Sequence, residues 1–289
     1  DIRAFKDPSA PKVPIIRHPD VRMMLMRQKA YAEGSRSLLL FAAYCADRER
    51  VATDEKEKKS WDYLTEILTP ICKAYCSDMG FRVTEWALQT YGGYGYIEEY
   101  PAAQYLRDAK IASIYEGTNG IQALDLVGRK MSMDGGAPLM ALAGLFAKFV
   151  EANKRNPILR GELEAFTEAR DHWGEINAFF MASALQKQLM VPIVNATHYL
   201  EICGDLMMAY LLLDQAVIAI RKLEALGVNP GDAKAVAALA KDNDEARYLD
   251  GKIKTARFFC AYELPMVKGK CAAIKSGDMS AMTIQWDGE

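Results

Sequence analysis

One carboxylate in this sequence has neighbours that suit acid–base chemistry. Glu116 is followed by Gly117, which readily takes the left-handed conformation that ends a helix, and by Thr118, a favourable N-cap for the next helix. A carboxylate at such a junction, beside Ile114 and Tyr115, is expected to be partly desolvated, which raises its pKa and suits a general base. The free N–H groups at the start of the next helix suit an anionic or polar ligand. Glutamates near helix caps are also common on surfaces, so the residue types alone leave both interpretations open.

A glycine-rich stretch precedes this junction. The segment Tyr91–Tyr96 reads Tyr-Gly-Gly-Tyr-Gly-Tyr, and its glycines permit positive φ or a close approach of the backbone to another group. No strand precedes it and the G-x-G-x-x-G spacing is missing, so a Rossmann nucleotide site is excluded. A helix C-cap followed by a turn is the simpler interpretation of this segment taken alone.

Composition limits the class of protein. The 289 residues are 51% hydrophobic and 26% charged with a net charge of −2, which is typical of a globular protein and not of a nucleic-acid-binding one. The closest cysteines, Cys72 and Cys76, lack a neighbouring histidine or second cysteine pair, so free thiols in a reducing compartment are expected and a metal site is not. With no signal pattern, and with a longest apolar run (Leu206–Leu213) too short for a bilayer, we expect a cytoplasmic protein without a membrane span.

Helical periodicity runs through the chain, and convincing strand patterns are absent. After an extended, proline-containing arm at 1–17, the predicted helices cover residues 19–48, 60–78, 80–91, 102–115, 118–131, 139–150, 161–183, 198–226 and 233–276. The charged stretch 47–59 is interpreted as a solvated corner between helices, and 134–138 as a linker. The expected fold class is all-α, with a four-helix bundle at 18–133 followed by a second helical domain at 139–289.

Four short motifs keep a common order and spacing over about forty residues. They are Tyr91–Tyr96, Glu99-Tyr100-Pro101, Leu106-Arg107-Asp108-Ala109 and Ile114-Tyr115-Glu116-Gly117-Thr118. Together they strongly resemble the C-terminal helical domain of flavin-dependent acyl-CoA dehydrogenases. The segments His18–Arg22 and Gln28–Gly34 resemble the opening helix of the larger members, which are similar to 3-methylmercaptopropionyl-CoA dehydrogenase and carry an additional C-terminal helical domain.

This resemblance implies an activity for Glu116. In the family, the glutamate of the Tyr-Glu-Gly-Thr motif is the base that removes the α-proton of an acyl-CoA thioester, while the β-hydrogen leaves as hydride to FAD and trans-2-enoyl-CoA forms. The developing enolate is stabilised by the backbone N–H of the base and by the flavin ribityl chain. Electrons then pass to electron-transfer flavoprotein. Some members place the base on the first helix instead, where Glu33 is the next candidate in this sequence.

The resemblance also implies an FAD site and an oligomer. A pattern that contacts the FAD of a neighbouring subunit corresponds here to Gln89, Thr90, Tyr91, Gly92 and Gly93. Residues that approach the flavin of the same subunit correspond to Gly117, Thr118 and Asn119. A homodimer or dimer of dimers is therefore expected. Arg107 and Asp108 are interpreted as an ion pair or cap rather than as catalytic residues.

The family's N-terminal helical domain and middle β-domain have no counterpart in these residues. The sequence is therefore expected to be a C-terminal fragment that is inactive alone. The alternative hypothesis is a non-catalytic helical module of the same lineage that serves assembly or binding. An intact Glu116 motif favours the enzyme, because a module without catalysis would not require a glutamate there.

Overall fold

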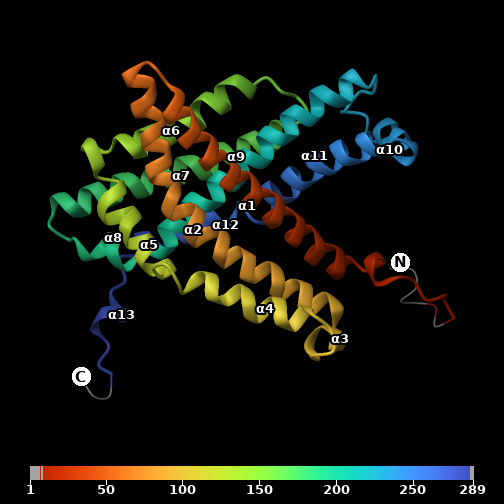
Figure 1. The fold of residues 1–289 in the computed structure, drawn as a ribbon, viewed down its shortest axis with the longest axis horizontal. Coiled ribbons are helices and arrows are strands. Elements are labelled where there is room, and N and C mark those ends of the chain that lie inside the picture. The colour runs from red at the N-terminus through yellow and green to blue at the C-terminus, as the bar shows by residue number, and fades with distance from the viewer. Residues whose placement is uncertain (1–6, 8, 287–289) are drawn as a thin grey trace.

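The computed structural model describes residue 7 and residues 9–286, and throughout these residues it consists of helices joined by turns (Figure 1). The described part of the chain contains no strand, which confirms the all-α class. The arm expected at 1–17 lies partly outside the described residues, and its last residues form a short 3-10 turn, η2 (Ile15–Arg17).

The first half is organised around two long helices that lie alongside each other. These are α1 (Pro19–Val51) and α2 (Glu55–Tyr91). The elements that follow are α3 (Gly93–Tyr96), α4 (Ala102–Lys110), the 3-10 turn η3 (Ile111–Ser113), α5 (Asn119–Asp125) and the π-helical turn η4 (Leu126–Lys130). Helices α3, α4 and α5 all pack on α2, so α2 is the support on which the motif region is built.

The expected division of α2 was wrong. The helices expected at 60–78 and 80–91 form one continuous helix, so two members of the four-helix bundle are a single element. A glycine inside a helix costs only about 1 kcal/mol relative to alanine, and packing of α2 against α1 and α4 outweighs that cost at Gly80. The helix also continues through Pro70, whose missing N–H leaves one carbonyl without its helical partner.

The expected solvated corner is much shorter than the charged stretch suggested. Helix α1 continues to Val51 and α2 begins at Glu55, which leaves three connecting residues. The Asp54 side chain caps α2 by accepting a hydrogen bond from the Glu57 N–H at 2.8 Å. Arg48 and Glu57 then form an ion pair of 2.5 Å across the corner. Charged side chains here stabilise helix ends, which is why the charge run did not mark a long loop.

The second half contains three long helices and several short ones. They are η5 (Met133–Gly135), α6 (Ala137–Asn153), α7 (Arg160–Leu185), α8 (Met190–Val194), α9 (Ala196–Ala225), α10 (Ala233–Asp242), α11 (Asp244–Tyr262), α12 (Met266–Lys275) and α13 (Ser280–Thr283). The single helix expected at 233–276 is therefore three helices. Asn243 is extended and caps α11 by accepting a hydrogen bond from the Ala246 N–H, and Pro265 is the N-cap residue of α12.

Helix α9 crosses the middle of the molecule, with helices of both halves packed around it (Figure 1). By length and hydropathy alone, the segments Met133–Asn153 and Ala196–Ala225 could each cross a membrane. The sequence analysis considered only the uninterrupted apolar run Leu206–Leu213, and it therefore underestimated the length of the apolar segment that contains this run. In the most apolar 18-residue stretch of α9, 78% of the residues are buried inside the protein, whereas the share in Met133–Asn153 is 22%. The high hydropathy of α9 is therefore that of a core helix.

The buried side chains of both halves form one continuous core. Leu38 and Ile67 of the first half belong to the same cluster as Leu142, Leu206 and Phe259 of the second. The segments 18–133 and 139–289 therefore pack on each other through α9, and the proposed boundary between them stays a prediction. The expected linker begins with left-handed residues, including Asp134 with φ of 47°.

Candidate active site

The turn from Glu116 to Asn119 joins η3 to α5 in an unusual conformation. Both Glu116 (φ 55°) and Gly117 (φ 83°) are left-handed. Thr118 is extended, and its Oγ1 accepts a hydrogen bond from the Ile121 N–H at 3.3 Å, which makes it the N-cap of α5 as the sequence indicated. A left-handed Gly117 was expected, but a left-handed Glu116 was not. A β-carbon in this region costs roughly 1–2 kcal/mol, so glutamate is an expensive choice here.

The Glu116 side chain is exposed, so the partial desolvation expected from the sequence is not provided within this chain. Among the described residues, its carboxylate has no hydrogen-bond or ion-pair partner, and the N–H groups of Glu116 and Gly117 have no acceptor. The turn thus presents a carboxylate and two backbone donors outward. These are groups that can take a proton and stabilise an oxyanion.

Helix α2 holds this turn through side chains that the sequence analysis did not single out. Lys73 Nζ donates to the Gly117 carbonyl oxygen at 2.6 Å and to Asn119 Oδ1 at 2.7 Å. Asn119 Nδ2 in turn donates to the Ala74 carbonyl oxygen at 3.1 Å and to Ser77 Oγ at 2.9 Å. Asn119 therefore contacts its own chain. A usable signal existed, because Lys73 has no acidic residue three or four positions away on α2 with which to pair.

The glycine-rich segment lies at the C-terminal end of α2. Gly92 ends the helix with φ of 59° and ψ of −139°. A β-carbon at Gly95 would lie 2.4 Å from the Leu88 carbonyl oxygen, so the fold requires glycine there. By contrast, Gly93 has an ordinary φ, and a β-carbon at Gly92 or Gly93 would meet no atom within 4 Å. Nothing within the described chain explains glycine at position 93.

The three residues before Gly92 differ in exposure: the Thr90 side chain is bonded within the chain, and Gln89 and Tyr91 are exposed. Thr90 Oγ1 donates to the Trp86 carbonyl oxygen at 2.7 Å and accepts from Gln28 Nε2 at 3.3 Å, so Thr90 faces α1. Gln89 and Tyr91 are exposed. Of this predicted set, Gln89, Tyr91 and the two glycines are therefore accessible to a ligand, while the Thr90 side chain is engaged by its own chain.

The two parts of the candidate site are not brought together within one chain. Lys73, which contacts the Glu116 turn, and Gln89 are sixteen residues apart on the continuous helix α2. At about 1.5 Å per residue they are separated by roughly 24 Å along its axis. Figure 1 likewise shows α3 and α5 at opposite ends of α4. One ligand therefore reaches both segments only if it is very extended or if two copies of the chain contribute.

Glu33, the alternative base, is half-buried and paired with two lysines. It accepts a hydrogen bond from Lys252 Nζ at 2.8 Å and also pairs with Lys29. Burial alone would raise the pKa of Glu33, but the bonds from Lys252 and Lys29 hold it below its usual value. A carboxylate stabilised in its charged form is a weak proton acceptor, so the geometry favours Glu116.

The other polar residues singled out are structural. Arg107 pairs with Glu98 at 3.5 Å on the surface, in agreement with the ion-pair interpretation, and Asp108 accepts a long hydrogen bond of 3.4 Å from Gln104. All six cysteines are free thiols. Burial raises the pKa of Cys72 to about 12, which makes it a poor nucleophile at neutral pH.

The described chain is all-helical. It carries an exposed glutamate on a left-handed turn and a long helix, α2, that ends at a glycine. Sequence comparison identifies the class of protein that has these features. Residues 2–131 match the family model described as acyl-CoA dehydrogenase, C-terminal domain. Residues 142–285 match the model described as acetyl-CoA dehydrogenase C-terminal like. The chain belongs to the acyl-CoA dehydrogenase family, in the group whose members carry the additional helical region.

Individual relatives agree with this family. The chain is 38% identical over 278 residues to a butyryl-CoA dehydrogenase of Syntrophomonas wolfei, covering 96% of this chain and 43% of that protein. It is 34% identical over 248 residues to the 3-methylmercaptopropionyl-CoA dehydrogenase of Ruegeria pomeroyi, covering 86% of this chain and 39% of that protein. The chain therefore spans less than half the length of the curated relatives it matches.

A solved structure shows the same fold. The acyl-CoA dehydrogenase of Bacillus anthracis, determined in complex with FAD, superposes with a TM-score of 0.58 at 17% identity, covering 97% of this chain and 45% of that one. At this identity the likeness concerns the arrangement of helices.

Proposed function

We propose that this chain supplies the catalytic base and part of the flavin site of an FAD-dependent acyl-CoA dehydrogenase. The reaction is α,β-dehydrogenation of an acyl-CoA thioester to trans-2-enoyl-CoA. The observation that carries the proposal is Glu116, which is unpaired and exposed on a left-handed turn that its own fold does not require. The names of the relatives, which act on butyryl-CoA and 3-methylmercaptopropionyl-CoA, support an acyl-CoA as the substrate class.

The residues of the turn have distinct tasks in this reaction. The α-proton of a thioester is weakly acidic, so its removal requires both a positioned base and stabilisation of the enolate oxygen. The Glu116 carboxylate takes the α-proton. The backbone N–H of Glu116, which has no acceptor among the described residues, donates to the thioester oxygen as negative charge develops there. Parts of the protein beyond this chain cover the exposed carboxylate and exclude water.

The chain's open surfaces fit an FAD group. Gly92 and Gly93 leave room that a β-carbon would occupy, and Gln89 and Tyr91 are accessible beside them. On the other side, Gly117, Thr118 and Asn119 lie at the turn that begins α5, and we assign this turn to the flavin of the same subunit. When bound, FAD accepts the β-hydrogen of the substrate together with its electron pair. The solved relative from Bacillus anthracis contains FAD, which supports this cofactor.

The separation of the two segments supports an oligomer. Because Gln89 lies roughly 24 Å along α2 from Lys73, the residue that contacts the 116–119 turn, the segments 89–93 and 116–119 each serve a different FAD in a homodimer or a dimer of dimers. Reduced enzyme then passes its electrons to electron-transfer flavoprotein. We place this activity in the cytoplasm, with which six free thiols are consistent.

The test is Glu116→Gln in the holoenzyme that contains this chain. Glutamine keeps the size and hydrogen bonding of glutamate but accepts no proton. FAD and butyryl-CoA should still bind, while reduction of the flavin should fall by several orders of magnitude, at the upper end of the roughly 10²–10⁴-fold typical of general-base loss or beyond it. The measurement is anaerobic stopped-flow bleaching of the oxidised flavin band after mixing with butyryl-CoA.

The matched control is Glu33→Gln, which removes the other candidate carboxylate from a site already neutralised by lysines. It should reduce flavin at close to the wild-type rate. Loss of activity in Glu33→Gln together with retention in Glu116→Gln would reverse the assignment. A holoenzyme that binds neither FAD nor acyl-CoA would instead support a non-catalytic module.

A further inference from the structure

The turn that carries Glu116 is poorly held by its own backbone. Its only backbone hydrogen bond among the described residues is the one that the Thr118 carbonyl oxygen accepts from the Gln122 N–H at 3.1 Å. Two successive left-handed residues persist only when surrounding contacts determine them. The Gly117 carbonyl oxygen lies within the strained pair, and the group that binds it is Lys73 Nζ, at 2.6 Å.

Lys73 also reaches the first residue of α5. Its second hydrogen bond, to Asn119 Oδ1 at 2.7 Å, ties both sides of Thr118 to one point on α2. The amide of Asn119 is itself fixed by Ser77 and by the Ala74 carbonyl oxygen. The side chain of Lys73 is therefore the centre of a polar cluster that connects the turn to the rigid helix below it.

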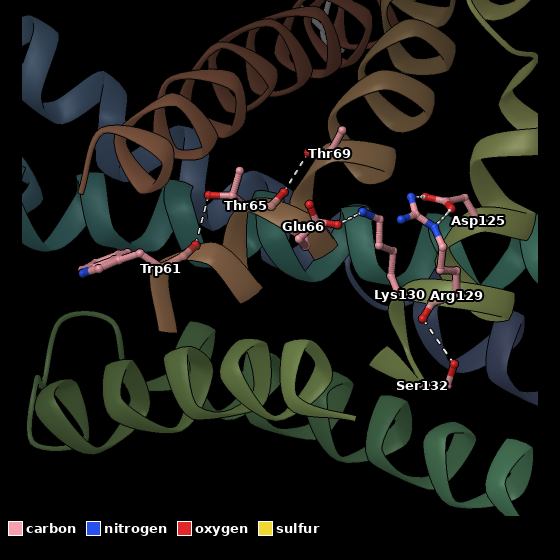
Figure 2. A network of polar contacts seen from close by, with 8 residues as sticks. All are labelled: Trp61, Thr65, Glu66, Thr69, Asp125, Arg129, Lys130 and Ser132. Atoms are coloured by element: carbon pink, nitrogen blue, oxygen red, sulfur yellow. Dashed lines mark hydrogen bonds and ion pairs between the residues drawn. The ribbon is translucent and has the colours of Figure 1, made fainter. Parts of the chain in front are cut away.

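The other end of this segment is fastened in the same way. The π-helical turn η4 directs Lys130 inward, where its ammonium pairs with the Glu66 carboxylate of α2 (Figure 2). Lys130 is 4% exposed and the Glu66 side chain 33%, so the lysine end of this pair is buried and the carboxylate end half-buried. Glu66 and Lys73 are seven residues, or about two turns, apart on α2. Residues 117–130 are thus held to one helix at both ends by a lysine.

We infer that Lys73 is a positioning residue for the dehydrogenation, acting through the Gly117 carbonyl oxygen and Asn119 to hold the Glu116 carboxylate and N–H in place. This inference rests on the proposed function of Glu116. Lys73 touches neither the reacting atoms nor, within this chain, the Glu116 carboxylate. Its loss should therefore weaken the chemical step more than the binding of substrate, because displacement of a base by about 1 Å is enough to cost roughly 10²-fold in rate.

The experiment compares Lys73→Met and Lys73→Arg in the FAD-loaded holoenzyme. Methionine keeps the length of the side chain but donates no hydrogen bonds. Lys73→Met should slow flavin reduction by saturating butyryl-CoA about 10–100-fold, with KM changed less than about 3-fold. Arginine offers several donors, so Lys73→Arg should recover most of the rate. If Lys73→Met does not fold, Lys73→Leu, which also donates no hydrogen bond, provides the same comparison.

Lys59→Met is the control, because Lys59 forms an exposed ion pair with Asp134 far from the turn in sequence. It should match the wild type. A Lys73→Met enzyme with an unchanged maximal rate, or with only a shifted pH–rate profile, would overturn the positioning role. Glu116→Gln in the same assay separates the two ideas. If it is inactive while Lys73→Met is normal, only the inference about Lys73 fails, and if Glu116→Gln is active the proposed function fails.

Discussion

Two regions of this protein treat their polar groups in opposite ways. The first, which we call the seam, is where α1 and α2 meet α9 and α11, with α12 packed on α9. There the Tyr75 hydroxyl donates to Asp205 Oδ1 at 2.6 Å, and Lys270 Nζ donates to Asp205 Oδ2 at 2.7 Å. Burial raises the pKa of Asp205, although both donors act against that rise. Similar contacts join Glu263 to Arg27 and Tyr31.

The second region, which we call the outer face, carries the candidate site. It contains Glu116 without a partner and exposed tyrosines that include Tyr91, Tyr96 and Tyr105. Gly93 is unexplained by local packing there, whereas Gly204 of the seam is explained by contact with Tyr75. Polar groups of the seam are paired within the chain, and we infer that they stabilise its fold. Those of the outer face lack such partners, and we infer that they contact a ligand or another subunit.

Replacement of a seam glycine should give the largest loss of stability. A β-carbon at Gly204 would lie 2.0 Å from a Tyr75 ring atom, and that ring is fully buried. Gly204→Ala should therefore lower the free energy of unfolding by about 3 kcal/mol, by overpacking. Gly174→Ala is the matched control in an exposed part of α7, and it should raise stability by about 1 kcal/mol. Urea denaturation measures the unfolding free energy of both variants. Equal changes in the two would show that Gly204 is no more constrained by packing than Gly174.

A pair of neighbouring glycines on the outer face should separate folding from binding. Gly95→Ala places a β-carbon against the Leu88 carbonyl oxygen and should cost about 2 kcal/mol of unfolding free energy. Gly93→Ala meets nothing in this chain and should leave unfolding nearly unchanged. It should instead weaken FAD binding in the holoenzyme, as measured by flavin release during dilution. Normal FAD affinity in Gly93→Ala would show that glycine 93 has no ligand role.

The acid sensitivity of the seam tests its ion pairs. The pKa of Glu33 is lowered in the folded protein, so its pairing stabilises the fold above the ordinary glutamate value and this contribution is lost as pH falls through the lower folded value. Wild type should exceed Glu33→Gln by about 1 kcal/mol at neutral pH, and the gap should close below about pH 4. The exposed pair of Glu151 serves as control, since Glu151→Gln should show no such gap.

The smallest expected effect on stability is an increase in the free energy of unfolding, at Glu116. Glycine tolerates the left-handed conformation that Glu116 adopts, although it loses more entropy on folding. Glu116→Gly should therefore raise the free energy of unfolding by about 0.5 kcal/mol while abolishing flavin reduction. The matched change Glu151→Gly, inside a helix, should lower stability by about 1 kcal/mol. Destabilisation by Glu116→Gly would mean that the glutamate serves the fold.

The sequence predicted what local physics controls. Apolar stripes at helical spacing predicted the all-α class, and the Gly117-Thr118 pair predicted the helix junction beside Glu116. Helix ends were less predictable, because packing carried α2 through Gly80 and an asparagine cap interrupted the span after 233. Lys73 was missed because its partners lie more than forty residues away. The local signal, the lack of an acidic residue three or four positions from Lys73 on α2, does not say which groups the lysine contacts.

The central position of α9 has a consequence for synthesis of the protein on the ribosome. Tyr75 emerges about 130 residues before Gly204 and Asp205, the residues of α9 that contact it. At about 5–20 residues per second this delay lasts roughly 6 to 26 seconds, during which an apolar surface of α1 and α2 has no partner in α9. Side chains of that surface that are buried in the finished fold, such as Tyr75 and Ile67, are therefore open to aggregation until α9 arrives.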